Sequence, residues 1–249
     1  MQVWPPGSQS LAAEPGLGVV VGGGGLGLAL VRAMRADPAY GRVILIARRV
    51  VEAPGAEVLI ADVLDEAALD RAAETVAAAG PPTRVIVASG VLHGRGVQPE
   101  KAMRALSADA LTEVLRVNAV GPALVARRLL PLMPRDRASA FAALSARVGS
   151  ISDNRLGGWH GYRASKAALN MLIRTLAIEH RRTHPLGVCV ALHPGTVDTP
   201  LSAPFQRGVA AERLFSPDKA ASALMGVLDA LPPEATGGFY AWDGAEIPW

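Results

Sequence analysis

Cysteine and aromatic residues are both scarce in this chain. Its one cysteine, Cys189, excludes a disulfide framework and a cysteine-based metal site, and its apolar surroundings predict a buried, unreactive thiol. Residues 15–31 carry no charge, but the glycines and the proline among them argue against a membrane-spanning helix. Residues 1–7 lack the basic head and apolar stretch of a signal peptide. We therefore expect a soluble, cytoplasmic protein.

Charge is also sparse. Charged residues make up 19% of the chain, and the formal net charge is only +3. The basic residues are mostly scattered arginines, without a stripe interleaved with aromatic side chains, so nucleic-acid binding is a weak hypothesis. Half of the 249 residues are hydrophobic, which is enough to build a large core in one domain.

The apolar pattern predicts an α/β fold. Short apolar runs alternate with longer stretches rich in alanine and leucine, which is typical of βα units around a parallel sheet. We expect strands near residues 18–21, 43–47, 57–61, 84–88, 140–144, 187–192 and 238–242, and helices near residues 26–35, 66–79, 108–132, 162–184 and 217–231. The prediction is one domain, residues 18–249, built on a doubly wound, seven-stranded parallel sheet (a Rossmann fold). Residues 1–17 are expected to form a loosely ordered leader.

The first predicted strand runs into a glycine-rich turn. Gly22, Gly24 and Gly27 satisfy the pattern G-x-G-x-x-G, and Gly25 and Leu26 complete the turn at the start of a helix. Glycines allow a tight turn and a close backbone approach to a pyrophosphate, while the amino end of the helix supplies N–H donors. The strand–turn–helix context predicts a dinucleotide phosphate site rather than a merely flexible loop.

The end of the second predicted strand bears on the choice of dinucleotide. An acidic residue there would bind the ribose 2′-hydroxyl of NAD, but this chain has Arg48 and Arg49. Arginine suits a 2′-phosphate, which favours NADP with Arg48 as the principal contact and leaves NAD possible. A solvated strand end explains the two arginines equally well. After the third strand, Asp62 and Val63 are placed to bracket the adenine, although Asp62 also suits the amino-terminal cap of the next helix.

Tyr162 and Lys166 form the most informative pair in the sequence. A helix brings residues four apart onto one face, so the phenol and the ammonium lie side by side. The cation is expected to lower the tyrosine pKa from about 10, which equips the phenol to exchange a proton with an alcohol oxygen. Alone, Tyr-x-x-x-Lys is more often a surface pair, so its meaning depends on the other motifs.

These motifs together resemble the short-chain dehydrogenase/reductase family. The matching pieces follow the family's order over nearly the whole chain: the glycine loop, Asn118, the Tyr162–Lys166 pair and the run 193–199. The stretches 144–154 and 237–244 are similar to the C-factor-like branch, named for a bacterial cell–cell signalling protein. The glycine loop is one residue shorter than the family's pattern.

The resemblance implies a role for each catalytic match. Tyr162 would be the general acid in reduction and the general base in oxidation. Lys166 would bind the nicotinamide ribose and lower the tyrosine pKa. Asn118 would hold a water that links the lysine to solvent, and its alternative reading is an asparagine at a helix kink.

The resemblance also implies contacts around the nicotinamide. Pro194, Gly195, Val197 and Thr199 would position its carboxamide, although a tight turn alone explains the Pro-Gly pair. Gly90 is all that remains of the asparagine-rich turn that usually follows the fourth strand.

The family's serine is the least certain member of the site. It should follow the fifth strand and stabilise charge on the substrate oxygen. The usual strand ending is Ser-Ser with the second serine active, but here the pair is Ser145-Ala146. We prefer Ser145, acting after a one-residue shift, over Ser150, which lies nearer Tyr162 in sequence.

The expected function is hydride transfer between NADP, or NAD, and a carbonyl compound or secondary alcohol. An activated phenol favours an enzyme, because a pure binding module does not need one. The alternative is a dinucleotide-binding signalling or scaffold protein with weak or no turnover.

The surroundings of the expected pocket would fit a large apolar carbonyl compound. They comprise His93, Trp159, His160 and residues 201–215, which the resemblance implies to be a lid over the substrate. A histidine beside a tryptophan is, however, more often ordinary packing than substrate recognition. The histidines have no metal-ligand spacing with nearby carboxylates, so no metal is expected. The apolar helices predict a homodimer or homotetramer.

Overall fold

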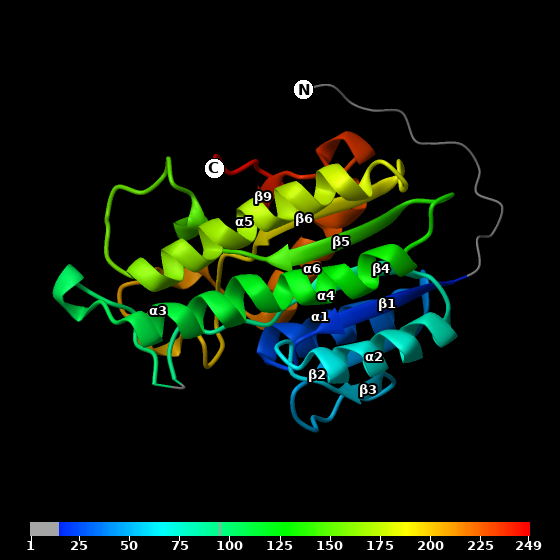
Figure 1. The fold of residues 1–249 in the computed structure, drawn as a ribbon, viewed down its shortest axis with the longest axis horizontal. Helices are drawn as coiled ribbons and strands as arrows, with labels where there is room; N and C mark the ends of the chain where they lie inside the picture. The colour runs from blue at the N-terminus through cyan, green and yellow to red at the C-terminus, as the bar shows by residue number, and fades with distance from the viewer. Residues whose placement is uncertain (1–14, 95) are drawn as a thin grey trace.

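Seven strands form one large parallel sheet in the order β3-β2-β1-β4-β5-β6-β9 (Figure 1). This computed structural model describes residues 15–94 and 96–249. The strands are β1 (Gly16–Val21), β2 (Tyr40–Ala47), β3 (Glu57–Ile60), β4 (Pro82–Val87), β5 (Ser139–Leu144), β6 (Gly187–His193) and β9 (Phe239–Ala241). The predicted doubly wound sheet is confirmed. Because β1 begins at Gly16, residues 16 and 17 of the expected leader belong to the sheet, and residues 1–14 lie outside the described part.

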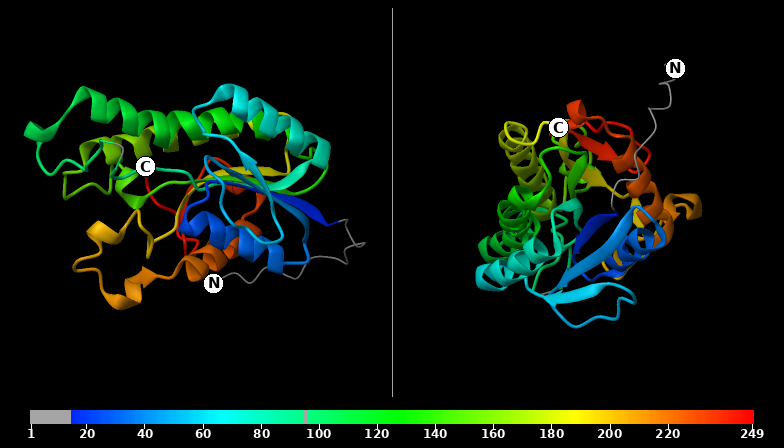
Figure 2. Two further views of the ribbon diagram at one scale, coloured as in Figure 1. Left: turned by 90° about the horizontal axis from the view of Figure 1, so that it is seen from below. Right: turned by 90° about the vertical axis from the view of Figure 1, so that its right-hand side faces the viewer.

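Helices cover both faces of the sheet (Figure 2). They are α1 (Gly25–Ala36), α2 (Glu66–Ala79), α3 (Ala108–Leu115), α4 (Gly121–Leu129), α5 (His160–His180) and α6 (Pro217–Ala230). Helices α2, α4 and α5 pack on one face, and α1 and α6 pack on the other. In the part of the chain that the structure describes, no helix is long and apolar enough to cross a membrane.

Two hydrophobic cores lie on opposite sides of the sheet, and alternate residues of each strand enter them. In β1, Val19 and Val21 join the core under α2, α4 and α5, while Val20 joins the core under α1 and α6. A sheet covered on both faces requires continuous apolar strands rather than alternating ones, which explains why short apolar runs predicted its strands.

The long helix predicted over residues 108–132 contains a π-helical turn. Helix α3 ends at Leu115, residues 116–120 form the π turn, and α4 begins at Gly121, whose N–H donates to the carbonyl of Arg116. Pro122 has no N–H to donate to the carbonyl of Asn118, so the regular helical ladder is broken at this point. The kink therefore lies at Asn118.

A second sheet of two short strands was not predicted. Strand β7 (Thr196–Val197) pairs in parallel with β8 (Leu214–Phe215). Two-residue strands are too short to show a period in the sequence. Their pairing closes residues 198–213 into a loop that follows β6 and β7 in the chain.

Candidate functional site

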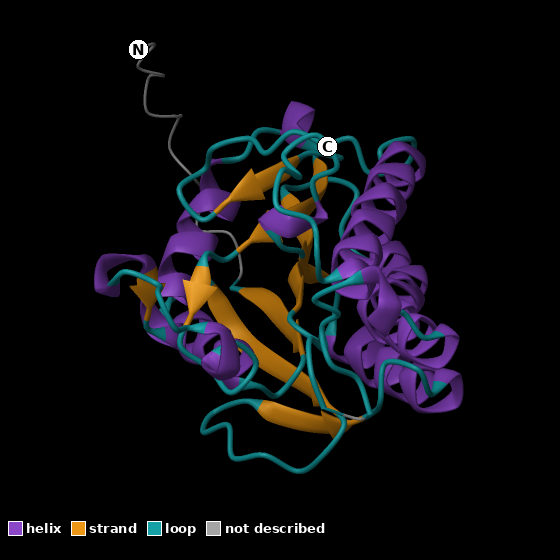
Figure 3. Cartoon of the chain, turned by 90° about the vertical axis from the view of Figure 1, so that its left-hand side faces the viewer, coloured by secondary structure: helices purple, strands orange, loops and turns teal. Residues whose placement is uncertain are grey.

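The candidate site lies at the carboxyl ends of the strands, and Figure 3 looks onto this edge. From β1 the chain continues to β2 on one side, while β4 lies on the other side. This reversal of strand order leaves a crevice at the end of β1, where doubly wound sheets bind ligands.

The glycine turn occupies this crevice between β1 and α1. Gly22 has φ = +123°, and a Cβ there would come within 2.8 Å of the Ser89 amide nitrogen. A Cβ at Gly27 would overlap the carbonyl oxygen of Gly22. Glycine is therefore required at both positions for the turn to pack against β4 and for α1 to pack on the turn.

The amino end of α1 is open and can accept an anion. Gly24 caps the helix without a side-chain hydrogen bond, and the first turn contains no acidic residue. A Cβ at Gly24 would meet nothing within 4 Å, whereas one at Gly25 would lie 3.1 Å from the Thr199 methyl group. Free N–H donors, positive helix-end potential and open space at Gly24 fit the pyrophosphate of a dinucleotide. Leu26 packs against the hydrophobic core that lies under α1 and α6.

Arg48 and Arg49 lie at the same edge. They directly follow Ala47, the last residue of β2, and both are exposed. Two cations therefore stand at the carboxyl end of β2, and their contact with a cofactor stays a prediction.

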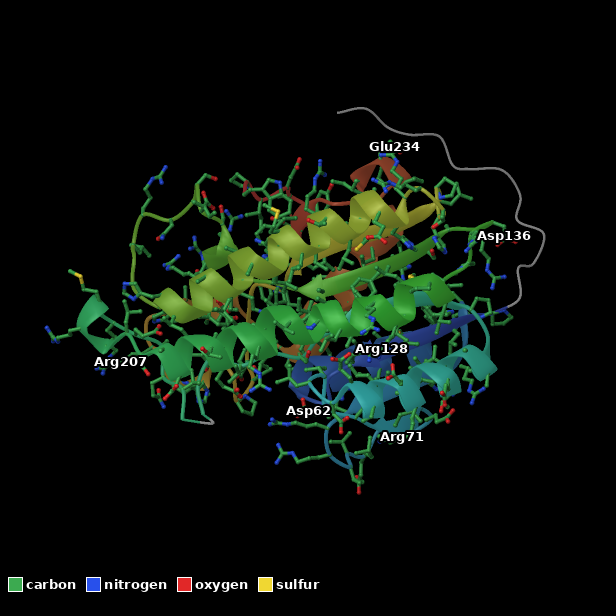
Figure 4. All side chains as sticks on the ribbon, viewed as in Figure 1. Asp62, Arg71, Arg128, Asp136, Arg207 and Glu234 are labelled. Atoms are coloured by element: carbon green, nitrogen blue, oxygen red, sulfur yellow. The ribbon has the colours of Figure 1, made fainter. Side chains whose placement is uncertain are left out.

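Asp62 is not the amino-terminal cap of α2, which was the alternative prediction for this residue. Its carboxylate accepts a hydrogen bond of 3.0 Å from the Leu64 amide, in a turn before α2. The cap of α2 is Asp65, whose side chain accepts from the Ala68 amide at 3.0 Å. That alternative is wrong, because the helix begins three residues later than it required. Asp62 lies in the turn between β3 and α2 (Figure 4).

Val63 is buried against α4. A Cβ at Gly121 would lie only 2.6 Å from a methyl group of Val63, so the two elements pack in direct contact here. The Val63 side chain is therefore packed against α4, which leaves the main chain of this residue at the edge of the sheet.

Tyr162 and Lys166 lie on the first two turns of α5. The Lys166 Nζ is 5.7 Å from the centre of the Tyr162 ring and donates a 2.8 Å hydrogen bond to the carbonyl of Leu144, at the end of β5. Burial raises the pKa of Tyr162 to about 12 and lowers that of Lys166 to about 8. The expected lowering of the tyrosine pKa is wrong for the protein alone, because the loss of hydration outweighs an ammonium that points at Leu144.

Asn118 connects the end of β4 to α5. Its Nδ2 donates to the Val91 carbonyl at 2.8 Å and to Ser165 Oγ at 3.0 Å, and its Oδ1 accepts from the Val91 amide at 2.7 Å. Ser165 Oγ donates in turn to the Tyr162 carbonyl at 2.8 Å. This chain of hydrogen bonds fixes α5 beside the sheet. The sequence does not predict it, because a serine within a helix carries no motif signal.

Gly90 brings Asn118 and Lys166 together. A Cβ on Gly90 would lie 3.4 Å from Asn118 Oδ1 and 3.7 Å from Lys166 Nζ. The bare backbone at Gly90 thus leaves space between the lysine and the edge of the sheet. Asn118 lies in the π-helical turn, as its helix-kink reading expects, and its role in the site stays a prediction.

The two serine candidates have different partners. Ser145 is buried and its hydroxyl donates a 2.6 Å hydrogen bond to Asn170 Oδ1. Ser150 is buried as well, and its Oγ accepts from the Asp153 amide at 3.1 Å. Ala146 follows Ser145, two residues after the end of β5, in extended conformation. Which of the two serines takes the family's role stays a prediction.

The turn after β6 approaches the glycine turn. Gly195 has φ = +77°, and a Cβ there would lie 2.9 Å from the Phe215 ring, so Pro194-Gly195 is a tight turn held against β8. The Val197 side chain is buried, and its carbonyl accepts a 2.5 Å hydrogen bond from Ser202 Oγ. Thr199 then reaches Gly25, so this turn and the glycine turn border one crevice.

Aromatic rings wall the site beside Tyr162. The Trp159 and Tyr162 ring centres are 6.2 Å apart, and those of Trp159 and Phe205 are 5.0 Å apart. His93 packs edge-on against Phe205 at 5.7 Å, and its Nε2 lies 3.0 Å from the Pro200 carbonyl. Three loops that follow three different strands therefore meet here, as the sequence predicted from the positions of His93, Trp159 and the lid.

A cavity of about 730 Å³ is lined by Phe205 and by residues between β4 and α3. Its wall includes Glu100, Lys101 and Asp109. Glu100 is a residue that sequence reasoning missed, since a single glutamate in a loop carries no periodic or motif signal.

Cys189 is buried, as the sequence predicts. It lies in β6, and burial raises the pKa of its thiol to about 12. Among residues 15–94 and 96–249, no three histidine, cysteine or acidic side chains are grouped in a way that could hold a metal ion.

Known proteins are similar to this chain in both sequence and fold. The model of the family described as short chain dehydrogenase matches residues 18–209. C-signal of Myxococcus xanthus is 36% identical over 140 residues, which are 56% of this chain and 78% of that protein. The 1-hydroxy-2-glutathionyl-2-methyl-3-butene dehydrogenase of a Rhodococcus species is 31% identical over 159 residues, 64% of this chain and 67% of that protein.

Solved structures extend the likeness to the whole fold. NADPH-bound carbonyl reductase from chicken fatty liver superposes with a TM-score of 0.81 at 25% identity, covering 93% of this chain and 98% of that one. Carbonyl reductase Sniffer of D. melanogaster gives a TM-score of 0.80 at 22% identity, covering 93% and 99%. Because the family model spans most of its length, this chain belongs to the short-chain dehydrogenase/reductase family of NAD(P)-dependent oxidoreductases.

Proposed function

We propose that this protein reduces apolar carbonyl compounds with NADPH, with Tyr162 as the proton donor. The observation that carries the proposal is the placement of Tyr162 and Lys166 at the carboxyl edge of the sheet, beside a helix amino end that is open to a pyrophosphate. A bound nicotinamide would supply the hydride. The chain itself would bind and orient the reactants, exclude water and provide the proton.

Tyr162 is suited to the acid role. With a pKa raised to about 12, its phenol carries its proton throughout the neutral range and can donate it to a carbonyl oxygen. The reverse reaction needs the phenolate, which is scarce at neutral pH unless binding adds positive charge beside the ring.

Lys166 would hold the ribose hydroxyls and keep positive charge near the phenol. Its pKa of about 8 leaves it mostly protonated at pH 7, and its bond to Leu144 uses one of three N–H donors. The remaining donors are available to a ribose. Asn118 would contribute to the proton path through the water that the family resemblance implies, and Ser145 would hydrogen-bond the substrate oxygen.

The preference for NADP is supported by Arg48 and Arg49. A guanidinium binds a phosphate through paired charge-assisted hydrogen bonds, and no acidic residue follows Ala47 to favour a ribose hydroxyl. The similar structures include a carbonyl reductase with NADPH bound and a short-chain dehydrogenase/reductase from Burkholderia multivorans with NADP bound.

The substrate class is supported by the aromatic wall. Rings of Trp159 and Phe205 lie next to Tyr162 and would cover an apolar substrate. For the assembly, we propose a homodimer or homotetramer through α5, where the side chains of Met171 and Ile178 are 67% and 54% exposed.

A binding protein of the C-factor-like branch is the second candidate. The likeness to C-signal and the alanine at position 146 favour it, because a signalling protein would not need the serine. A panel of aromatic and aliphatic ketones and aldehydes, tested with NADPH and with NADH by cofactor absorbance, separates the two functions. Turnover of any carbonyl compound supports the enzyme; tight NADPH binding without turnover across the panel contradicts it.

A further inference from the structure

We infer that Glu100 is a positioning residue that holds the first turn of α5, and with it Tyr162, in place. This inference rests on the proposed function of Tyr162. Glu100 lies in the segment between β4 and α3, and it is 5% exposed. In the described part of the chain it is the one acidic residue that is buried. A buried carboxyl group is costly unless its oxygens are hydrogen-bonded, so its partners indicate what it does.

Helix α5 has no amino-terminal cap of its own. The capping position is Trp159, which is left-handed (φ 51°, ψ 43°) and whose side chain makes no capping hydrogen bond. The N–H groups of a helix's first turn have no acceptor within the helix and need one from elsewhere. Glu100 provides it from a segment about 60 residues earlier in the chain.

Glu100 uses both its side chain and its main chain for this purpose. Its Oε2 accepts a 3.0 Å hydrogen bond from the Gly161 amide. Its carbonyl oxygen accepts a 2.5 Å hydrogen bond from the Trp159 amide. The carboxyl group also lies at the positive end of the helix dipole, which favours a negative side chain at this position.

The contact between Glu100 and α5 leaves no spare room. A Cβ on Gly161 would lie 2.9 Å from Glu100 Oε1 and 3.2 Å from a methyl carbon of Leu111. Glycine at position 161 therefore allows the carboxyl group to reach the helix backbone. Glu100, Gly161 and Leu111 form one packed unit at the start of α5.

The residue after Gly161 is Tyr162. A movement of the first turn would displace the phenol, and proton transfer is sensitive to errors of about 1 Å in the position of the donor. Glu100 also lines the 730 Å³ cavity together with Phe205. Glu100 thus acts on the reaction through Tyr162 and does not touch the substrate oxygen.

Two variants separate the hydrogen bond from the packing. Glu100→Gln keeps an acceptor oxygen and the volume of the side chain, whereas Glu100→Leu keeps the volume and removes the acceptor. Glu234→Leu, at an exposed site on the opposite side of the molecule, is the control for an exposed glutamate (Figure 4). We expect Glu100→Leu to lower kcat by about 10- to 100-fold while the NADPH dissociation constant stays within about twofold. Glu100→Gln is expected to keep at least a third of the wild-type kcat.

Amide hydrogen exchange tests the same contact without turnover. The Gly161 amide should exchange at least tenfold faster in Glu100→Leu than in the wild type, and Glu100→Gln should retain its protection. The inference is overturned if Glu100→Leu matches the wild type in kcat, or if Glu100→Gln is as impaired as Glu100→Leu. If wild type itself reduces no carbonyl compound, the proposed function fails, and unchanged Gly161 exchange in Glu100→Leu overturns the positioning role independently.

Discussion

The Lys166 ammonium lies 5.7 Å from the centre of the Tyr162 ring, yet it does not lower the tyrosine pKa. Its hydrogen bond is to the Leu144 carbonyl, and burial shifts the pKa values of the two groups toward their neutral forms, to about 12 and about 8. Desolvation therefore wins over attraction in the protein alone. Below pH 8 the phenol and the lysine are therefore both protonated for the most part in the protein alone.

Tyr162→Phe should abolish carbonyl reduction without weakening NADPH binding. Loss of the phenolic proton is expected to lower kcat by about 10²–10⁴-fold, the usual contribution of a general acid. The ring and its contact with Trp159 remain, so the pocket keeps its shape. Steady-state rates and fluorescence titration with NADPH measure the two quantities. Tyr40→Phe, at the amino end of β2 and so away from the carboxyl edge of the sheet, is the matched control. Activity near the wild-type rate in Tyr162→Phe would refute the assigned acid.

The buried Lys166 should destabilise the folded protein less at alkaline pH than at neutral pH. The comparison protein is Lys166→Met. In the folded state the pKa of Lys166 is about 8, against 10.5 in the unfolded chain. The free-energy cost of burying the ammonium is therefore at its maximum below pH 8. This penalty fades as pH rises from about 8 to 10.5, and its full size is about 3 kcal/mol.

Urea unfolding at pH 7.5, 9 and 10 checks this prediction. The unfolding free energy of the wild type should increase relative to that of Lys166→Met as the pH rises. Comparing the two proteins at each pH removes the contributions of Cys189 and Tyr162, whose raised pKa values act in the opposite direction. A difference that is constant over this range contradicts the lowered lysine pKa.

The sequence was sufficient for the sheet and for the residues at its edge. Apolar runs located the seven strands because a sheet covered on both faces has no polar interruptions. Helix spacing put Tyr162 beside Lys166, and strand–turn–helix order put Gly22 and Gly27 at the switch point. These features depend on local pattern, so no tertiary information was required.

Other features depend on contacts between distant segments. The capping of α5 by Glu100 joins residues 61 positions apart, and neither residue type signals the other. The true cap of α2 is Asp65 rather than Asp62, because two aspartates with similar spacing compete and only the backbone decides. The tyrosine pKa depends on burial, which a sequence does not give.

Arg48→Ala should weaken NADPH binding much more than NADH binding. Loss of a charge-assisted hydrogen bond costs about 1.5–3 kcal/mol, equivalent to roughly a 10- to 100-fold higher dissociation constant for NADPH. NADH lacks the 2′-phosphate, so its affinity should change less than twofold. Titration calorimetry with both cofactors measures this, with the exposed Arg71→Ala on α2 as a control for an arbitrary arginine (Figure 4). Equal losses for the two cofactors would remove Arg48 from the phosphate site.

The stacked pair His180 and His184 should make the fold sensitive to acid. Their ring centres are 4.0 Å apart, both side chains are buried, and burial together with His184 lowers the pKa of His180 to about 4. Between pH 6.5 and 4 the unfolded chain binds a proton that the folded His180 does not, so stability falls as pH falls through this range. His180→Phe should flatten the dependence of the urea midpoint on pH between 7 and 4.5. His193, with a pKa also near 4, contributes equally in both proteins. A variant as acid-sensitive as the wild type would exclude the pair as the cause.

The serine question is decided by three substitutions at the end of β5. If Ser145 stabilises the substrate oxygen, it must exchange its hydrogen bond with Asn170 for one with substrate, and Ser145→Ala should lower kcat by about 10²-fold. Ser150→Ala should then have little effect, because its hydroxyl serves the Asp153 amide. If strict register holds instead, position 146 faces the substrate, Ser145→Ala is harmless, and Ala146→Ser raises kcat. The rates of all three variants with one ketone at saturating NADPH distinguish these cases, since only the first predicts a loss at 145 without a gain at 146.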